Sequence, residues 1–163
     1  MDLNKVEDMA KKMRRKILDI SHNCNLSAHI GGGLSIVDIT ATLYGAILKY
    51  DTNDSDWEDR DRFILSKGHG ALGYYTALMA AGIISEEILQ TFQTNGSDLT
   101  GHPVMNLKLG IESSNGSLGH GLAWGVGISL GIKRKSIDAN VYVLLGDGEC
   151  DEGSVWESVM SAT

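Results

Sequence analysis

The sequence predicts an α/β fold, a parallel sheet flanked by helices, in a single domain over residues 1–163. Two short apolar runs, 63–66 and 140–145, have the length and composition of buried strands, and helical patterns lie between and after them. Short buried strands that alternate with helices are typical of parallel sheets covered by helices. With 163 residues, of which 42% are hydrophobic, the chain is long enough to form such a core.

The first part of the chain is expected to form two helices joined by a polar, glycine-rich loop. Apolar residues recur every three or four positions from residue 3 to residue 22, which predicts an amphipathic helix. The loop has the sequence SAHIGGG and contains His29. Ser35 is a favourable N-cap with Asp38 three residues later, so the second helix is expected to run from there to about Leu48.

The remaining elements follow from turn residues and apolar periodicity. In order they are a charged loop at 51–62, a strand at 63–66, a helix at 71–82, a short helix at 85–92, a loop at 94–114, a glycine-rich helix at 119–133, a strand at 140–145 and a helix from Ser154. The glycines of the 119–133 helix permit very close packing. They leave open whether this helix packs inside the molecule or against another subunit.

Composition excludes several functional classes. The net charge is −7 and no basic patch offsets it, which argues against nucleic acid and anionic membranes as partners. Cys24 and Cys150 form no CxxC pair, so we expect reduced thiols. No leader pattern opens the sequence, and the apolar stretch 119–132 is too short to span a bilayer. A soluble, cytoplasmic protein is therefore expected.

The second strand ends in Gly146-Asp147-Gly148, which suits a diphosphate and a divalent metal. Glycines allow the backbone to approach a ligand closely, and N–H groups at the start of the next helix can bind phosphate oxygens. An aspartate there repels phosphate unless a cation such as Mg²⁺ (or Ca²⁺) bridges the two. The alternative is a simple turn in which Asp147 caps the helix.

Three histidines lie in loops flanked by glycine or proline. His29, His69 and His102 occur in AHIGGG, KGHG and GHP, and together they suggest a convergent polar pocket. Histidine can hydrogen-bond an anionic ligand and move protons. Ordinary surface histidines are one alternative, and a zinc site is a weaker one because the spacing matches no zinc motif.

The sequence resembles the N-terminal part of transketolases, the thiamine-diphosphate enzymes that move two-carbon ketol units between sugars. The resemblance covers nearly the whole chain. Its motifs, in the family's order, are SAHIGGGLS, DRDRFILSKGHG, GHP, GIESSNGSLGHGL and LLGDGECDEGSVWE. RRKIL, GGGLS and LSKGHG resemble most the short N-terminal subunit of two-subunit transketolases. The resemblance implies a diphosphate-binding domain that is incomplete at its C-terminus.

The resemblance also implies which residues bind the cofactor. Asp147 matches the metal-binding aspartate of the family, and Gly146 and Gly148 match the glycines that frame the diphosphate. Gly116 and Leu118 match positions that line the rings of thiamine diphosphate. The cofactor itself would supply the electron sink for ketol transfer.

Four further positions match residues with catalytic roles in the family. His69 matches a histidine that contacts the diphosphate near the reacting carbons. His29 and His102 match histidines that hydrogen-bond the sugar and assist proton transfer. Glu152 matches an acidic residue at a subunit interface that links paired active sites.

The family's second metal ligand, an asparagine, would lie beyond residue 163, and its activating glutamate belongs to another domain. We therefore expect this chain alone to be inactive and to need a C-terminal, pyrimidine-binding chain, in a homo- or hetero-oligomer that acts on sugar phosphates. The sequence departs from the family at Ala28, at His120 and at the pair Cys150-Asp151. Two alternatives remain: a non-catalytic remnant or interaction subunit, or another thiamine-diphosphate enzyme such as a deoxyxylulose-phosphate synthase.

Overall fold

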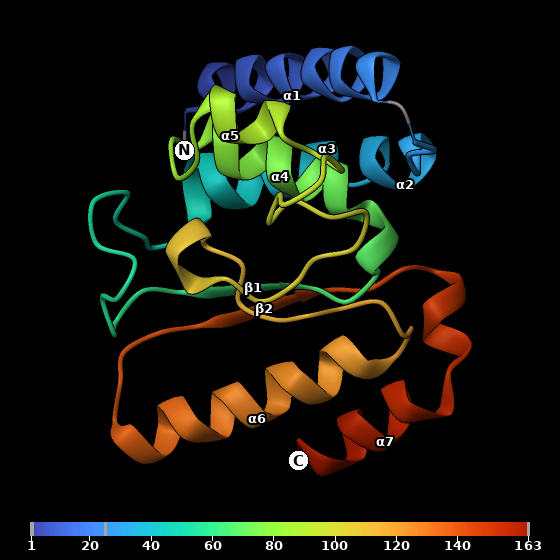
Figure 1. Cartoon of the computed structure of the whole chain (residues 1–163). Coiled ribbons are helices and arrows are strands. Elements are labelled where there is room, and N and C mark those ends of the chain that lie inside the picture. The colour runs from blue at the N-terminus through green and yellow to red at the C-terminus, as the bar shows by residue number, and fades with distance from the viewer. Residues whose placement is uncertain (1, 25, 163) are drawn as a thin grey trace. The chain divides into compact units, whose positions relative to one another are not determined.

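The computed structural model describes residues 2–24 and 26–162 (Figure 1). Their contacts divide the chain into two compact units, which are described separately. The helical unit contains the described residues up to Leu48 together with His69–His102. The α/β unit contains Lys49–Gly68 together with the described residues from Pro103 onward. The expectation of a single domain over residues 1–163 stays a prediction.

The helical unit is built around a buried helix, α4, against which α1, α2 and α3 pack (Figure 1). Its elements are α1 (Leu3–Asn23), α2 (Ile30–Leu34), α3 (Val37–Thr42), a π-helical turn (Leu43–Ile47), α4 (Ala71–Ala80) and α5 (Glu86–Gln90). Every residue of α4 from Ala71 to Met79 is buried, as expected for a helix that is apolar on all sides. The amphipathic periodicity predicted for α1 is confirmed, since Met13 and Ile17 are fully buried on its inner face.

Two local predictions for this unit are wrong. The expected glycine-rich loop contains the short helix α2, and Ser35 ends that helix instead of starting the next one. The Ser35 hydroxyl donates back to the Gly32 carbonyl oxygen at 2.9 Å, a common alternative to N-capping for serine. The predicted cap at Ser85 is confirmed, because its hydroxyl accepts from the Ile88 N–H at 3.3 Å.

Among the described residues, one helical run, Ile30–Ile47, is long and apolar enough to cross a membrane by length and composition alone. The core helix of a soluble protein passes the same test. Several side chains in this run, including Ile36, Val37 and Ala41, are buried in the helical unit.

The α/β unit contains two parallel strands, which confirms the predicted parallel pairing. Strand β1 (Arg62–Leu65) pairs with β2 (Val141–Leu144), with Phe63 opposite Tyr142 and Leu65 opposite Leu144. Helix α6 (His120–Lys135) runs along these strands, and α7 (Gly153–Ser161) lies beside α6 (Figure 1). Short 3-10 turns occur at Leu107–Leu109 and Gly148–Asp151.

The glycines of α6 divide into two groups. A Cβ on Gly121 would lie 2.5 Å from Ser66, and one on Gly125 would lie 2.4 Å from Cγ2 of Val143. These two glycines therefore allow α6 to pack closely on the strands. Gly127 and Gly131 have open space where a Cβ would be, so for them packing against another subunit stays a prediction.

A network of ion pairs and hydrogen bonds between charged residues links the N-terminal ends of the two strands to neighbouring segments. Arg60 Nη2 donates to both carboxylate oxygens of Glu112, at 3.0 and 3.2 Å, and Arg62 Nε lies 3.6 Å from the same carboxylate. The buried Asp61 carboxylate accepts from the backbone N–H groups of Lys49 and Asn140, at 2.9 and 2.7 Å. The charged loop 51–62 is thus anchored by its last residues.

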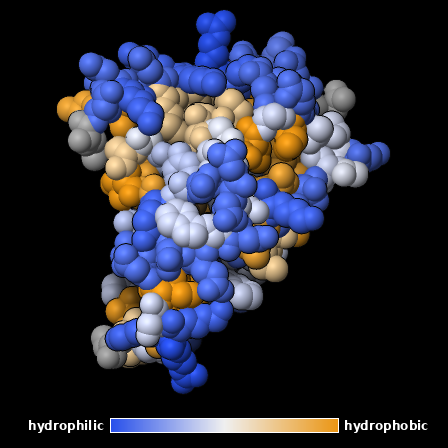
Figure 2. All heavy atoms as spheres, turned by 90° about the vertical axis from the view of Figure 1, so that its left-hand side faces the viewer, coloured by the Kyte–Doolittle hydropathy of each residue, from blue (hydrophilic) through white to orange (hydrophobic). Residues whose placement is uncertain are grey.

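The face in Figure 2 is mostly hydrophilic, with separate apolar patches between the polar residues. Cys24 and Cys150 are both free and half-buried, in agreement with the expectation of reduced thiols.

Candidate active site

The structure brings the three predicted histidines together in the helical unit. The ring centroids of His29 and His69 are 5.9 Å apart, and those of His29 and His102 are 5.7 Å apart. Both pairs meet edge to face, at 69° and 72° between the ring planes. His29 and His102 are exposed and His69 is half-buried, so the cluster is open to a ligand.

Glycines in α2 and α4 make this approach possible. His29 immediately precedes α2, and His69 lies just before α4. A Cβ on Gly32 would lie 2.8 Å from Cδ2 of His69, and one on Gly73 would lie 2.4 Å from the Gly33 carbonyl oxygen. Without side chains at these positions, α2 rests directly on the start of α4, and His29 reaches His69.

The loop that carries His102 is held from two sides. The Thr100 hydroxyl donates to the His102 carbonyl oxygen at 2.6 Å. The Tyr75 hydroxyl, on α4, donates to the Thr100 carbonyl oxygen at 3.0 Å. Burial raises the pKa of Tyr75, so its hydroxyl stays protonated and remains a donor.

The Gly146-Asp147-Gly148 loop follows β2 in the α/β unit. Asp147 precedes the 3-10 turn Gly148–Asp151, but its carboxylate makes no capping hydrogen bond and is exposed. The alternative of Asp147 as a side-chain cap is therefore not found. A Cβ on Gly148 would meet no atom within 4 Å, so the chain has open space at the residue after Asp147.

A buried glutamate next to this loop was missed by the sequence analysis. Glu149 is 2% exposed. Its carboxylate accepts from the Ser66 hydroxyl and from the N–H groups of Gly119 and Gly146, the latter two at 2.8 Å each. These bonds bring Gly119, at the start of α6, next to the loop after β2. Four acids lie close together in GDGECDE, and nothing in their spacing distinguishes the buried one.

The residues predicted to line the cofactor rings lie just before α6. Gly116 and Leu118 are exposed, and a Cβ on Gly116 would meet no atom within 4 Å. Gly119 has φ of +82°, a left-handed conformation that favours glycine, and it forms the N-cap of α6. The 116–118 segment is therefore accessible from solvent, as a ligand would require.

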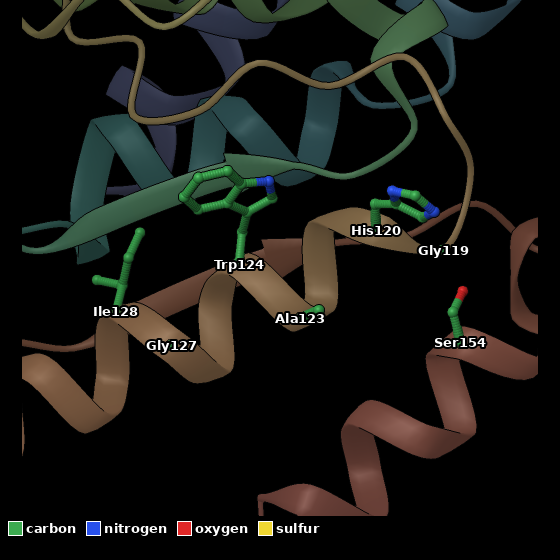
Figure 3. Close-up of a pocket in the computed structure, with 7 residues that line it drawn as sticks. All are labelled: Gly119, His120, Ala123, Trp124, Gly127, Ile128 and Ser154. Carbon is green, nitrogen blue, oxygen red and sulfur yellow. The ribbon is translucent and has the colours of Figure 1, made fainter.

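A largely apolar cavity of about 650 Å³ lies on α6 near the start of α7. Its lining residues are Gly119, His120, Ala123, Trp124, Gly127, Ile128 and Ser154. In Figure 3, His120 and Trp124 project from the same side of α6, and Ser154 points from the start of α7 toward the Gly119 end of α6. His120, a departure from the family pattern, thus lies next to the predicted ring-binding segment.

Glu152 is exposed and immediately precedes α7. A Cβ on Gly119 would lie 3.0 Å from Cβ of Glu152, so Glu152 is a neighbour of the N-cap of α6. Its role at a subunit interface stays a prediction.

Within residues 2–24 and 26–162, no three His, Cys, Asp or Glu side chains are grouped so that they could hold a metal ion. Asp147 offers one carboxylate, and a cation bound to it would need further oxygen ligands from phosphate, water or other chain segments. An exposed, uncapped carboxylate beside an open glycine fits that arrangement. The roles of Asp147 and of the three histidines stay predictions.

Comparison with known proteins identifies the family. The family model described as "Transketolase, thiamine diphosphate binding domain" matches residues 6–163. The chain belongs to this transketolase family. The resemblance seen in the sequence motifs is therefore confirmed, and so is the α/β fold.

Similar proteins include transketolase subunits. An apulose-4-phosphate transketolase subunit from Actinobacillus succinogenes is 43% identical over 99% of this chain and 59% of its own length. The 6-deoxy-6-sulfo-D-fructose transketolase subunit SqwG of Clostridium sp. is 36% identical over 92% of this chain and 59% of its own length. The transketolase from Leishmania mexicana superimposes with a TM-score of 0.86 and 32% identity, over 94% of this chain and 24% of that one. This transketolase-family chain therefore spans about three fifths of the length of the two subunits.

Proposed function

We propose that the chain is the N-terminal, thiamine-diphosphate-binding part of a two-chain transketolase that moves two-carbon ketol units between sugar phosphates. The observation that carries this proposal is the meeting of His29, His69 and His102 at centroid distances of 5.7 and 5.9 Å. These histidines come from three separate segments of the helical unit, just before α2, just before α4 and in the loop after α5.

The α/β unit offers residues that fit the cofactor. Asp147 would bind Mg²⁺, and the exposed Gly148, where a Cβ would meet no atom within 4 Å, would leave room for the diphosphate. Gly116 and Leu118 are exposed where the rings would lie. Bound thiamine diphosphate supplies the electron sink for breaking and forming the carbon–carbon bond.

The histidines would bind the sugar substrate and take part in acid–base catalysis. His29 and His102 are exposed and can donate hydrogen bonds to its carbonyl and hydroxyl oxygens. An imidazole ring is also a common general acid or base, the role that ketol transfer needs from them. The family resemblance assigns the half-buried His69 to the diphosphate.

A partner chain is part of the proposal. The relatives from Actinobacillus succinogenes and Clostridium sp. are both described as transketolase subunits. We infer that this chain likewise works with a pyrimidine-binding chain, which would supply the remaining groups of the active site.

The test is reconstitution with a candidate pyrimidine-binding chain encoded nearby. We expect the co-purified pair to transfer ketol units from a ketose phosphate when Mg²⁺ and thiamine diphosphate are added. Replacing His102 with Ala should lower kcat/KM by about 10²-fold or more, because a positioned acid–base group contributes roughly that much. His22→Ala is the matched control, since His22 is exposed at the end of α1, outside the cluster.

Two outcomes would replace this proposal. Decarboxylation of pyruvate without ketose cleavage would indicate a synthase such as the deoxyxylulose-phosphate enzyme. A stable complex with no turnover would indicate an interaction subunit.

A further inference from the structure

The buried carboxylate of Glu149 joins three segments of the α/β unit that are far apart in sequence. Ser66 directly follows β1, Gly146 follows β2, and Gly119 caps α6. Oε1 of Glu149 accepts from the Ser66 hydroxyl and from the Gly119 N–H, and Oε2 accepts from the Gly146 N–H. The Ser66 oxygen in turn accepts from the Gly121 N–H at 3.1 Å.

The chemistry of the partners requires a carboxylate at this position. Both glycine partners are backbone N–H groups, which can only donate, and they bind opposite oxygens of Glu149. A glutamine has one acceptor oxygen and one NH₂ group, so it can satisfy only one of the two glycines. The other glycine N–H would face the NH₂ group, donor against donor, in a buried position.

The close approach of Gly119 and Gly121 to neighbouring segments agrees with these hydrogen bonds. A Cβ on Gly121 would lie 2.5 Å from the Ser66 hydroxyl, and one on Gly119 would lie 3.0 Å from Glu152. The start of α6 is thus pressed against the residue that follows β1 and against the start of α7. Glu149 adds hydrogen bonds from this contact to the loop after β2. The N–H groups of Gly119 and Gly146 are used by Glu149 and are not free to bind a phosphate.

We propose that Glu149 is a positioning residue that fixes the Gly146–Gly148 loop to the start of α6. Through these bonds it would hold Asp147 and the 116–118 segment in a constant relative position. The consequence for cofactor binding rests on the proposed function, whereas the locking of the loop does not.

The test is amide hydrogen exchange, measured residue by residue by NMR, on the wild-type chain and on the variant Glu149→Gln. We expect the exchange protection of one of Gly119 and Gly146 to fall by about tenfold or more, while the other glycine and the β2 amides keep theirs. Glu149→Ala should lower the exchange protection of the N–H groups of both Gly119 and Gly146. Ser66→Ala should weaken protection at Gly121 and leave Gly146 protected.

Glu58→Gln is the matched control, because Glu58 forms an exposed ion pair with Lys135 that contributes little. Unchanged protection of both glycines in Glu149→Gln would overturn the proposal. A loss shared equally with β2 would overturn it as well, since that result indicates general destabilisation. If Glu149→Ala does not fold, the proposal is still tested by Glu149→Gln, through the difference in exchange protection between Gly119 and Gly146.

A second measurement uses the reconstituted pair. We expect Glu149→Gln to raise the KM for thiamine diphosphate by about tenfold with kcat at saturating cofactor nearly unchanged, because a loosened loop weakens binding more than chemistry. An unchanged KM would show that the locked loop does not serve the cofactor. If the wild-type pair transfers no ketol units, the proposed function fails, and the exchange experiment still tests the locking.

Discussion

At the scale of single residues, Tyr75 links the buried helix α4 to the loop that carries His102. Its side chain is fully buried, and its ring packs on Tyr74 and Phe92 at centroid distances of 6.1 and 6.0 Å. Its hydroxyl reaches the Thr100 carbonyl oxygen at the edge of this packing. The hydrogen bond therefore fixes the residue two positions before His102.

The substitution Tyr75→Phe removes this hydrogen bond and keeps the ring. We expect the free energy of unfolding in urea to fall by about 1 kcal/mol, the usual net contribution of one hydrogen bond. Tyr142→Phe is the control, since Tyr142 is half-buried on β2, and its effect should stay within about 0.5 kcal/mol. Equal stability of Tyr75→Phe and wild type would mean that water replaces the hydroxyl without cost.

The residue scale also shows what the sequence can and cannot predict about the site. Glycine- and proline-flanked loops predicted that His29, His69 and His102 converge, and their rings do meet. Glu149 could not be predicted, because its burial depends on Ser66 and Gly119, which the fold brings from distant parts of the chain. Local patterns reveal which residue types are available, whereas burial depends on contacts between distant segments.

At the scale of elements, apolar periodicity predicted the long helices well and short glycine-rich helices poorly. Helix α1 was expected at residues 3–22 and is found at Leu3–Asn23. Helix α2 was expected to be a loop because three consecutive glycines have low intrinsic helix propensity. Close packing of Gly33 on Gly73 of α4 accounts for its presence, and such tertiary contacts leave no periodic signal in the sequence.

Helix α6 offers a matched pair of glycines for testing its packing. A Cβ on Gly125 would lie 2.4 Å from Val143, so Gly125→Ala must push α6 away from the strands. We expect Gly125→Ala to lower the free energy of unfolding by about 1–3 kcal/mol, as overpacking usually does. A Cβ on Gly127 would meet no atom within 4 Å. Gly127→Ala should therefore raise the free energy of unfolding by up to about 1 kcal/mol, because alanine has a higher helix propensity than glycine.

Chemical denaturation of both variants measures the difference. If the two variants proved equally stable, α6 would not be packed as closely on β1 and β2 as the structure shows. Gly127→Ala could instead prevent assembly with the partner chain while leaving the isolated chain stable. That result would place Gly127 in an interface, in agreement with the interpretation that the glycine-rich helix packs against another subunit.

At the scale of the whole molecule, the chain folds as two compact units, each made of two separate sequence segments. The sequence alone suggested no boundary, because no linker-like composition separates the units. Within the α/β unit, the parallel order of β1 and β2 followed from the alternation of strands and helices. The net charge of −7 gave no indication that several charges would be buried at one end of the strands.

The largely buried side chain of Glu112 makes the stability of the molecule depend on pH in a direction that can be tested. Burial raises the pKa of Glu112, and the opposing effects of Arg60 and Arg62 do not cancel it. A carboxyl group with a higher pKa in the folded chain binds more protons when folded. Its contribution to stability is therefore present below the ordinary value of 4.5 and is lost as pH rises through the folded value.

We therefore expect the free energy of unfolding of the wild type, minus that of Glu112→Gln, to decrease as pH rises from about 4 to about 7. Urea denaturation at each pH measures both quantities. The same difference measured for Glu58→Gln is the control, since Glu58 is exposed. A difference that grew with pH would show that attraction to Arg60 and Arg62 outweighs burial, so that the charged form of Glu112 stabilises the fold.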